Sequence, residues 1–340
     1  MNAKTKSRLR RLGGILFLQL AVIVACELRC RSFIREYGVT PFQVSADPEL
    51  SSELRPGFST TYTGVHVRIN SSGYRGAEFP APLPGVPRIA LIGDSYVFGS
   101  GVDEQDTLGA SLERALTEAG HPCQVLAFGV PGYTGLDTAR VLESRVMEHQ
   151  PDLVLYVNFA NDIQLPIKYT SIPPDAVIDP TVKYRLHSAA IEYGVLLARR
   201  VGWALGYYIG SDHEANIKAE YAGPGGAGLR AAIARMQAVC SAAGLPYQIA
   251  IYPHLGVPEL DPLRVTDRLL MEEAPSLGVN VIDLLPAFEG ERNLTHYWVG
   301  PFDSHPNAAG HLRASRFLAD QLLSLDVITA ARAHAATRGS

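Results

Sequence analysis

From Arg88 onward, short runs of apolar residues alternate with longer stretches in which apolar residues recur every three or four positions. The short runs predict strands at residues 88–93, 124–129, 153–158, 247–252 and 279–283. The longer stretches predict helices near residues 106–119, 135–149, 228–243, 262–274 and 307–323. Strands and helices that alternate in this way form a parallel sheet with helices on both faces. The pattern therefore predicts one three-layer α/β/α domain over residues 88–325.

Three segments fall outside this alternation. Residues 31–87 are rich in Ser, Pro, Gly and Thr, so we expect an extended lead-in with one hairpin near residues 61–70. Residues 163–225 begin with several prolines, include an apolar run and end in a glycine-rich stretch, which indicates an insertion or cap. Residues 326–340 are expected to form a C-terminal tail.

The first 30 residues have a pattern of their own. Five cations precede an apolar run of about 14 residues that ends at Cys26. A membrane-spanning helix needs about 20 apolar residues, and extension of the run through Leu28 reduces the deficit. Three interpretations stay open: a retained signal anchor, a cleaved signal peptide, and a lipoprotein signal with Cys26 as the acylated residue. We favour an anchor at residues 13–30, since no good small-x-small cleavage site follows the run.

The same basic residues predict an orientation. Cytoplasmic flanks of membrane helices carry an excess of Lys and Arg, so residues 1–12 are expected to be a cytoplasmic tail. The domain after the helix is then expected to face the periplasm or the exterior of the cell.

Composition excludes several other classes of protein. The 340 residues are 47% hydrophobic and carry a formal net charge of −4, so the chain is globular and has no basic surplus for binding nucleic acid. The four Cys lack the paired spacing of zinc sites, and no metal or organic cofactor is predicted. Residues 223–228 spell G-x-G-x-x-G, but no buried strand precedes them, which argues against a dinucleotide site.

Candidate chemistry lies where the predicted strands end. The first strand leads into Gly93-Asp94-Ser95, the second is followed by Gly132, and the third by Asn161. Because the carboxyl ends of parallel strands meet at one edge, these groups are expected to converge. Ser95 is then a candidate nucleophile. The backbone N–H of Gly132 and the side-chain amide of Asn161 are candidate donors to an oxyanion.

A candidate base follows near the C-terminus. His305 lies in a predicted loop two residues after Asp303, just before the last helix of the domain. A serine hydroxyl is a weak nucleophile without a base to remove its proton, and a histidine oriented by a carboxylate supplies one. His311 falls within the predicted helix, where a structural or solvated role is expected.

These blocks, taken in order, resemble the SGNH (GDSL-type) hydrolase family of esterases and lipases over about residues 60–325. The resemblance implies a flavodoxin-like fold with a central parallel sheet. It also implies that Ser95 is the nucleophile and that His305, with Asp303 as its acid, is the base. The oxyanion donors it implies are the backbone N–H groups of Ser95 and Gly132 and the side-chain amide of Asn161. Residues 70–76 look like the lead-in of membrane-anchored bacterial members.

Two positions depart from the family pattern. Phe159 stands where the third block usually has Gly, which is expected to narrow the pocket. The last block reads Asp-x-His in place of the frequent Asp-x-x-His, so it stays open whether Asp303 or another carbonyl or carboxylate orients His305.

The resemblance implies hydrolysis of carboxylic esters through an acyl-enzyme, with a small acyl ester or an acylated envelope glycan or lipid as substrate. One alternative is an O-acetyltransferase that acts on an envelope polysaccharide. Another is a catalytically silent glycan-binding or assembly protein with the same fold.

Overall fold

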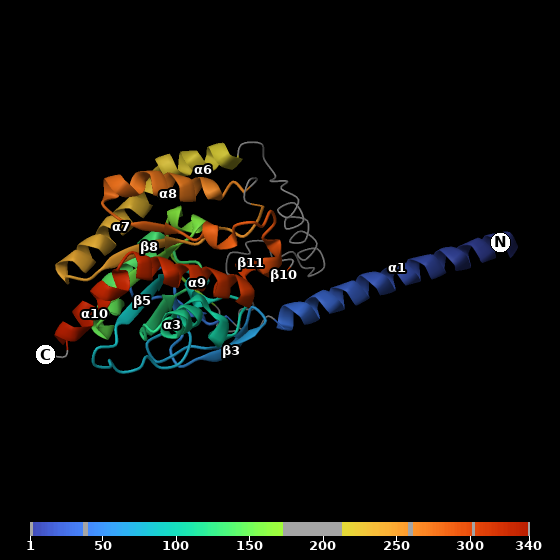
Figure 1. The fold of residues 1–340 in the computed structure, drawn as a ribbon. Coiled ribbons are helices and arrows are strands. Elements are labelled where there is room, and N and C mark those ends of the chain that lie inside the picture. The colour runs from blue at the N-terminus through green and yellow to red at the C-terminus, as the bar shows by residue number, and fades with distance from the viewer. Residues whose placement is uncertain (1–2, 37–39, 173–212, 258–260, 301–302, 339–340) are drawn as a thin grey trace.

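A parallel sheet of five strands forms the centre of the molecule (Figure 1). The computed structural model of the chain describes residues 3–36, 40–172, 213–257, 261–300 and 303–338. In spatial order the strands are β6 (Gln124–Gly129), β5 (Arg88–Gly93), β7 (Leu153–Asn158), β8 (Tyr247–Ile251) and β9 (Val281–Asp283). The winding of the chain reverses between β5 and β7, which is where open sheets of this kind bind ligands.

Helices cover both faces of this sheet, so β5 and β7 are buried along their whole length. Successive side chains of a strand point to opposite faces. Ile92 therefore enters one core and Leu91 the other. Burial on both sides explains why these strands appear in the sequence as unbroken apolar runs.

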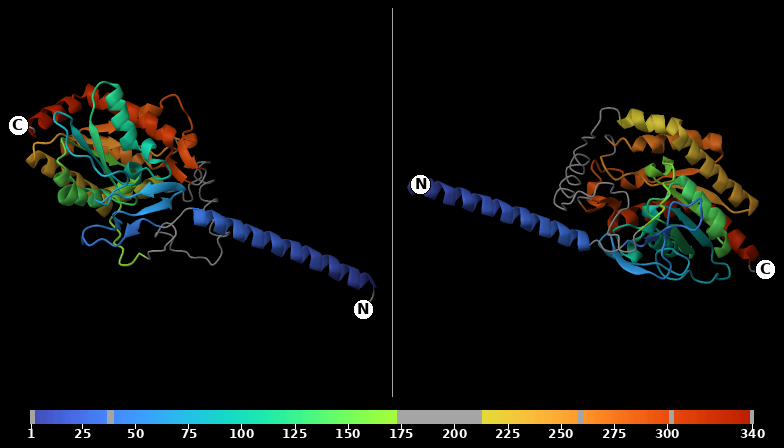
Figure 2. Two further views of the ribbon diagram at one scale, coloured as in Figure 1. Left: turned by 90° about the horizontal axis from the view of Figure 1, so that it is seen from below. Right: turned by 180° about the vertical axis from the view of Figure 1, so that it is seen from behind.

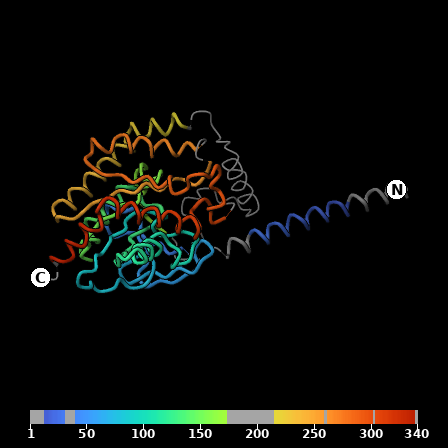
Figure 3. The backbone as a smooth tube through the Cα atoms, in the orientation of Figure 1, coloured from blue at the N-terminus to red at the C-terminus, as the bar shows by residue number. Residues whose placement is uncertain are grey.

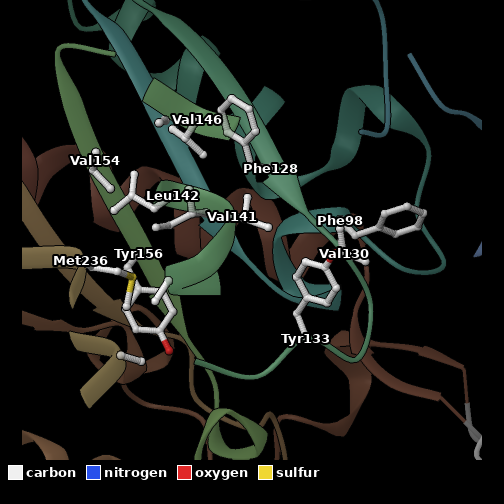
Figure 4. Close-up of a cluster of buried hydrophobic side chains, with 14 of the residues drawn as sticks. Phe98, Phe128, Val130, Tyr133, Val141, Leu142, Val146, Val154, Tyr156 and Met236 are labelled. Atoms are coloured by element: carbon white, nitrogen blue, oxygen red, sulfur yellow. The ribbon is translucent and has the colours of Figure 1, made fainter. Parts of the chain in front are cut away.

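The two helical layers are distinct (Figure 2). Helices α3 (Leu108–Glu118), α9 (Ala308–Ser324) and α10 (Val327–Arg338) cover one face, and α4 (Gly135–Val141), α7 (Pro224–Ala242) and α8 (Arg264–Leu277) cover the other. Helix α6 (His213–Ala222) packs on α7 and α8. Figure 4 shows the core between the sheet and α4, α7 and α8, which contains Leu142, Tyr156 and Met236. This arrangement confirms the predicted flavodoxin-like α/β/α class.

The elements follow the sequence pattern with local differences. The predicted helix 135–149 is α-helical only as far as Val141, and it continues as a wider π-helical turn (Leu142–Val146) and a tighter 3₁₀ turn (Met147–His149). Further short 3₁₀ turns are Glu104–Asp106, Ala160–Ile163, Leu285–Phe288 and Thr295–Tyr297. In the expected C-terminal tail, helix α10 buries Ile328, Ala331 and Ala335, so this segment is packed. Much of the expected insertion, residues 173–212, lies outside the described residues.

The lead-in is folded against the domain. It contains the paired strands β1 (Phe42–Gln43) and β2 (Glu53–Leu54), and the hairpin of β3 (Ser59–Tyr62) and β4 (Val65–Arg68). Its apolar side chains belong to the same core as α4 and α7. The buried Asp137 carboxylate accepts hydrogen bonds from the backbone N–H of Ser51 at 2.8 Å and from its hydroxyl at 3.1 Å, which ties the lead-in to α4.

Helix α1 (Ala3–Glu36) extends away from the domain (Figure 1), on the side opposite α10 (Figure 3). Its segment Gly13–Cys30 has 18 residues and is exposed, and it is long and apolar enough to cross a membrane. The predicted anchor is thus a helix of suitable length.

Candidate active site

Ser95 is the first residue of the short helix α2 (Ser95–Phe98), which begins immediately after β5. Asp94 caps this helix, and its carboxylate accepts a hydrogen bond from the backbone N–H of Tyr96 at 2.9 Å. Gly93 is required at the turn, because a Cβ there would lie 2.8 Å from both the carbonyl oxygen of Val157 and the Val97 side chain. The turn presents Ser95 at the carboxyl edge of the sheet, beside the reversal of winding.

Helix α2 packs on the end of the neighbouring strand β6. A Cβ on Gly129, the last residue of β6, would lie 2.3 Å from the backbone nitrogen of Phe98, so α2 packs directly on the strand end. Gly132 follows in an exposed turn at the same edge of the sheet. The backbone N–H of Val130, between the two glycines, donates to the carbonyl of Gly93 at 3.3 Å and joins the two strand ends.

The candidate base comes from a hairpin that follows β9 in the chain. Strands β10 (Trp298–Gly300) and β11 (Asp303–Pro306) pair antiparallel, so His305 lies in a short strand and not in the expected loop. Residues two apart in an extended chain point to the same side. The Nδ1 atom of His305 is accordingly 2.6 Å from Oδ1 of Asp303. The shorter Asp-x-His spacing thus brings the carboxylate to the imidazole.

The structure connects the hairpin to the first strand end. Nε2 of His305 lies 2.9 Å from Oγ of Ser95, across 210 positions of sequence. The three side chains of Ser95, His305 and Asp303 therefore form one continuous line of hydrogen bonds. Oγ of Ser95 is also 3.3 Å from the Asp94 carboxylate.

Burial changes the pKa of the carboxyl group next to Ser95. Asp94 is fully buried, and loss of solvation raises the pKa of its carboxyl, while the Tyr96 N–H and the positive charge of His305 oppose that rise. The side chain of Asn161, in the turn after β7, also lowers the pKa of the Asp94 carboxyl. The candidate oxyanion residue thus lies next to the residue that precedes Ser95.

The turn that carries Asn161 is organised by its neighbour, Asp162. One carboxylate oxygen of Asp162 accepts hydrogen bonds from the Tyr156 hydroxyl at 2.7 Å, the Asn158 amide at 3.1 Å and the backbone N–H of Phe159 at 3.0 Å. Burial raises the pKa of this carboxyl well above its usual range, and the nearby Asp94 carboxyl adds to the effect. Asp162 therefore holds the turn in place from inside the domain.

Aromatic rings pack beside His305 and the residue that follows Ser95. Phe159 stacks on Tyr96 with ring centroids 4.0 Å apart, and Tyr96 is 5.6 Å from the His305 ring. Tyr252 lies behind Tyr96 at 4.9 Å. The bulky residue at position 159 thus packs on the residue that follows the candidate nucleophile.

Sequence reasoning missed His254, which follows the end of β8. Its ring is buried 5.9 Å from Trp298, and its Nδ1 atom lies 2.5 Å from the buried carboxylate of Asp261. The signal was present, because a polar residue directly after a parallel strand is the pattern that identified Ser95 and Asn161. Within the described parts of the chain, no group of three or more His, Cys, Asp and Glu side chains could hold a metal ion.

Some solved structures are similar to this chain at low sequence identity. The chain is similar to the structure of a lipase/acylhydrolase from Enterococcus faecalis, with 16% identity and a TM-score of 0.42, over 71% of this chain and 97% of that one. It is also similar to a family 3 carbohydrate esterase from Clostridium thermocellum, with 15% identity and a TM-score of 0.43, over 71% of this chain and 96% of that one. No match to a curated protein was found.

A family model gives the more specific result. Residues 91–313, about two thirds of the chain, match the model of the GDSL-like Lipase/Acylhydrolase family. The matched span includes Ser95, Asn161, Asp303 and His305. With the match extending over more than half of its length, the chain belongs to the GDSL-like lipase/acylhydrolase family.

Proposed function

We propose that this protein hydrolyses carboxylic esters through an acyl-enzyme formed on Ser95. The observation that carries the proposal is the line of hydrogen bonds from Asp303 through His305 to Oγ of Ser95. A serine hydroxyl becomes an effective nucleophile when a neutral imidazole takes its proton, and a distance of 2.9 Å allows that transfer. Membership in a family of acylhydrolases supports the same reaction class.

In the proposed reaction, Oγ of Ser95 attacks the acyl carbon while its proton moves to Nε2 of His305. The bond to the leaving alcohol breaks as His305 gives that proton to the leaving oxygen. Water then attacks the acyl carbon while its proton moves to His305. The bond to Oγ of Ser95 breaks as His305 returns that proton to Oγ, and the acid is released. Asp303 keeps the Nδ1–H tautomer in place and stabilises the imidazolium that forms in each half of the reaction.

The negative oxygen of the tetrahedral intermediate needs hydrogen-bond donors. We assign this role to the backbone N–H groups of Ser95 and Gly132 and to the side-chain amide of Asn161. The assignment is supported by their positions after three neighbouring strands, β5, β6 and β7. One such donor typically stabilises the transition state by about 3 kcal/mol.

As substrate we propose a small acyl group, such as acetyl, on a glycan or lipid of the cell envelope. The partly exposed ring of Phe159, which stacks on Tyr96 next to Ser95, favours a short acyl chain. An apolar helix of membrane-spanning length before the domain favours an envelope location. Residues 88–325 would then form the hydrolase domain outside the cytoplasmic membrane.

The first prediction tests this function on the full-length protein purified in detergent. We expect it to hydrolyse p-nitrophenyl acetate, and Ser95→Ala to lose that activity with its melting temperature nearly unchanged, because the change removes a single oxygen atom and leaves no large cavity. Substantial residual turnover in Ser95→Ala would refute the mechanism.

The same assay separates hydrolysis from its alternatives. Adding sugar acceptors distinguishes the reactions, because an O-acetyltransferase would give an acetylated sugar in place of acetate. A wild-type protein that neither releases p-nitrophenol nor becomes acylated would indicate a catalytically silent member of the family.

A further inference from the structure

The segment that follows Ser95 is held by a side chain from the lead-in. Arg75 reaches this segment with both terminal nitrogens of its guanidinium group. One nitrogen donates to the carbonyls of Phe98 at 3.1 Å and Gly99 at 2.5 Å, and the other donates to the carbonyl of Val102 at 2.5 Å. The guanidinium also lies 5.2 Å from the centre of the Phe98 ring.

These carbonyls are one turn away from the candidate nucleophile. Phe98 is the last residue of α2, and Gly99 caps the helix with its backbone N–H on the carbonyl of Ser95 at 2.9 Å. The N–H of Ser100 donates to the same carbonyl at 3.2 Å. A displacement of residues 98–102 would therefore be transmitted directly to the backbone of Ser95.

The lead-in presents Arg75 from a preorganised loop. The side chain of Asn70 accepts from the backbone N–H of Tyr74 at 2.9 Å and donates to the carbonyl of Ala77 at 3.1 Å, which closes the loop around Arg75. Tyr74 is buried, and its ring lies 4.8 Å from that of Phe128 in β6. Tyr74 thus anchors the loop that presents Arg75 to the domain.

Arg75 is well suited to a fixed structural link. It is 8% exposed, and burial lowers the pKa of its guanidinium to about 10, so it stays charged at neutral pH. The planar fork of donors can reach three carbonyls at once, which a single ammonium group cannot reproduce. The β3–β4 hairpin of the lead-in makes a second contact with this segment, because the N–H of Gly101 donates to the Thr63 hydroxyl at 3.0 Å.

We propose that Arg75 is a positioning residue for Ser95. The lead-in, through Arg75, then keeps the backbone of Ser95 in the position that the reaction requires. The proposal rests on the proposed function of Ser95. It concerns residues that the family match does not include, because that match begins at residue 91. The loop after the nucleophile is therefore aligned from the segment that joins the apolar helix to the domain.

The test uses full-length protein with Arg75→Ala, which leaves a guanidinium-sized space. Active sites are counted by titration with an activated phosphonate that labels Ser95, so that kcat for p-nitrophenyl acetate refers to folded, reactive protein. We expect kcat per titrated site to fall by about 10- to 100-fold, with KM unchanged within about twofold, since small misplacements of reacting groups have effects of this size. Added guanidinium ion at millimolar concentration is expected to restore part of kcat.

The matched control is Arg68→Ala in the same segment. Arg68 is exposed and forms a loose ion pair with Glu104 at 3.8 Å, so this variant is expected to keep the wild-type kcat. If Arg75 only stabilises the fold, Arg75→Ala would reduce the number of titrated sites. Its kcat per site would then equal that of the wild type, and added guanidinium would not change it. That result overturns the proposal.

The two proposals fail in different ways. An active wild type with an equally active Arg75→Ala refutes the positioning role alone. A wild type that neither hydrolyses esters nor reacts with the phosphonate refutes the proposed function, and the role of Arg75 with it.

Discussion

Single residues set the chemistry of this site by their position within an element. Asp303 and His305 are two residues apart, and the extended backbone of β11 places both side chains on the same side of the strand, so that Asp303 contacts His305 and His305 contacts Ser95. The same spacing in a helix would place them on different faces. Oδ1 of Asp303 also accepts from the backbone N–H of His305 at 3.1 Å, which fixes the carboxylate on its own strand.

The second prediction follows from this geometry. Hydrolysis is expected to rise with pH as the His305 imidazole loses its proton, because only the neutral ring can act as base. His305→Ala should remove this rise together with most of the rate, since a general base usually contributes about 10²- to 10⁴-fold. Asp303→Asn should lower kcat by up to about 10⁴-fold, because the amide no longer keeps the Nδ1–H tautomer in place. The measurement is a pH profile of kcat for each variant.

An Asp303→Asn variant with near wild-type kcat would mean that another carbonyl or carboxylate orients the imidazole. Circular dichroism serves as the control for folding, since neither substitution creates a large cavity.

At the scale of elements, the site is assembled by the packing of helices and hairpins on the sheet edge. Helix α9 begins at Ala308, directly after β11, and is capped by the side chain of Asn307 on the N–H of Gly310 at 3.1 Å. Its first turns bury His311 against Tyr252, with ring centroids 5.9 Å apart. His311 therefore packs in the core beside Tyr252.

The third prediction concerns the free energy of unfolding of the protein at acid pH. Burial lowers the pKa of His311 to about 3, with smaller contributions from the charges of His305 and Arg75. In the unfolded chain a histidine takes up a proton below about pH 6.5. Between these values the unfolded state binds more protons, so His311 lowers the free energy of unfolding by up to about 1.4 kcal/mol per pH unit as the pH falls.

His311→Phe removes this group and keeps a ring in the core. Urea unfolding of wild type and variant at pH 7 and pH 5 should show a smaller loss of stability in the variant. Other titrating groups, such as Asp267 with its pKa raised to about 7 by burial, act in both proteins and cancel in the comparison. An equal loss in the two proteins would show that His311 is not kept neutral by the fold.

At the scale of the whole molecule, one long helix precedes a domain whose lead-in contacts the segment after the candidate nucleophile. The apolar segment Gly13–Cys30 is exposed and is not buried against the described residues of the domain, whereas the lead-in is packed into a core. A bilayer would cover this segment, and the basic residues before it would stay on the cytoplasmic side. The domain would then stand on the opposite side of the membrane, close to its surface.

The fourth prediction tests anchor and orientation together. The mass of the protein extracted from membranes should include residues 1–25, whereas lipoprotein processing would remove them and leave Cys26 acylated. Protease added to spheroplasts should digest the domain without lysis. Digestion only after lysis would place the domain in the cytoplasm and reverse the proposed orientation.

The sequence by itself determined the order of the elements, the parallel sheet and the polar groups at its strand ends. These follow from local periodicity and from the rule that parallel strands end at one edge. The sequence marks Ser95 and His305 as candidates, but their contact spans 210 positions and is decided by the tertiary structure. The tertiary structure alone decided that β11 is extended, that His254 pairs with Asp261, and that Arg75 holds the loop after Ser95. Each depends on contacts between segments distant in sequence or paired in space, and no local pattern of apolar and polar residues encodes such contacts.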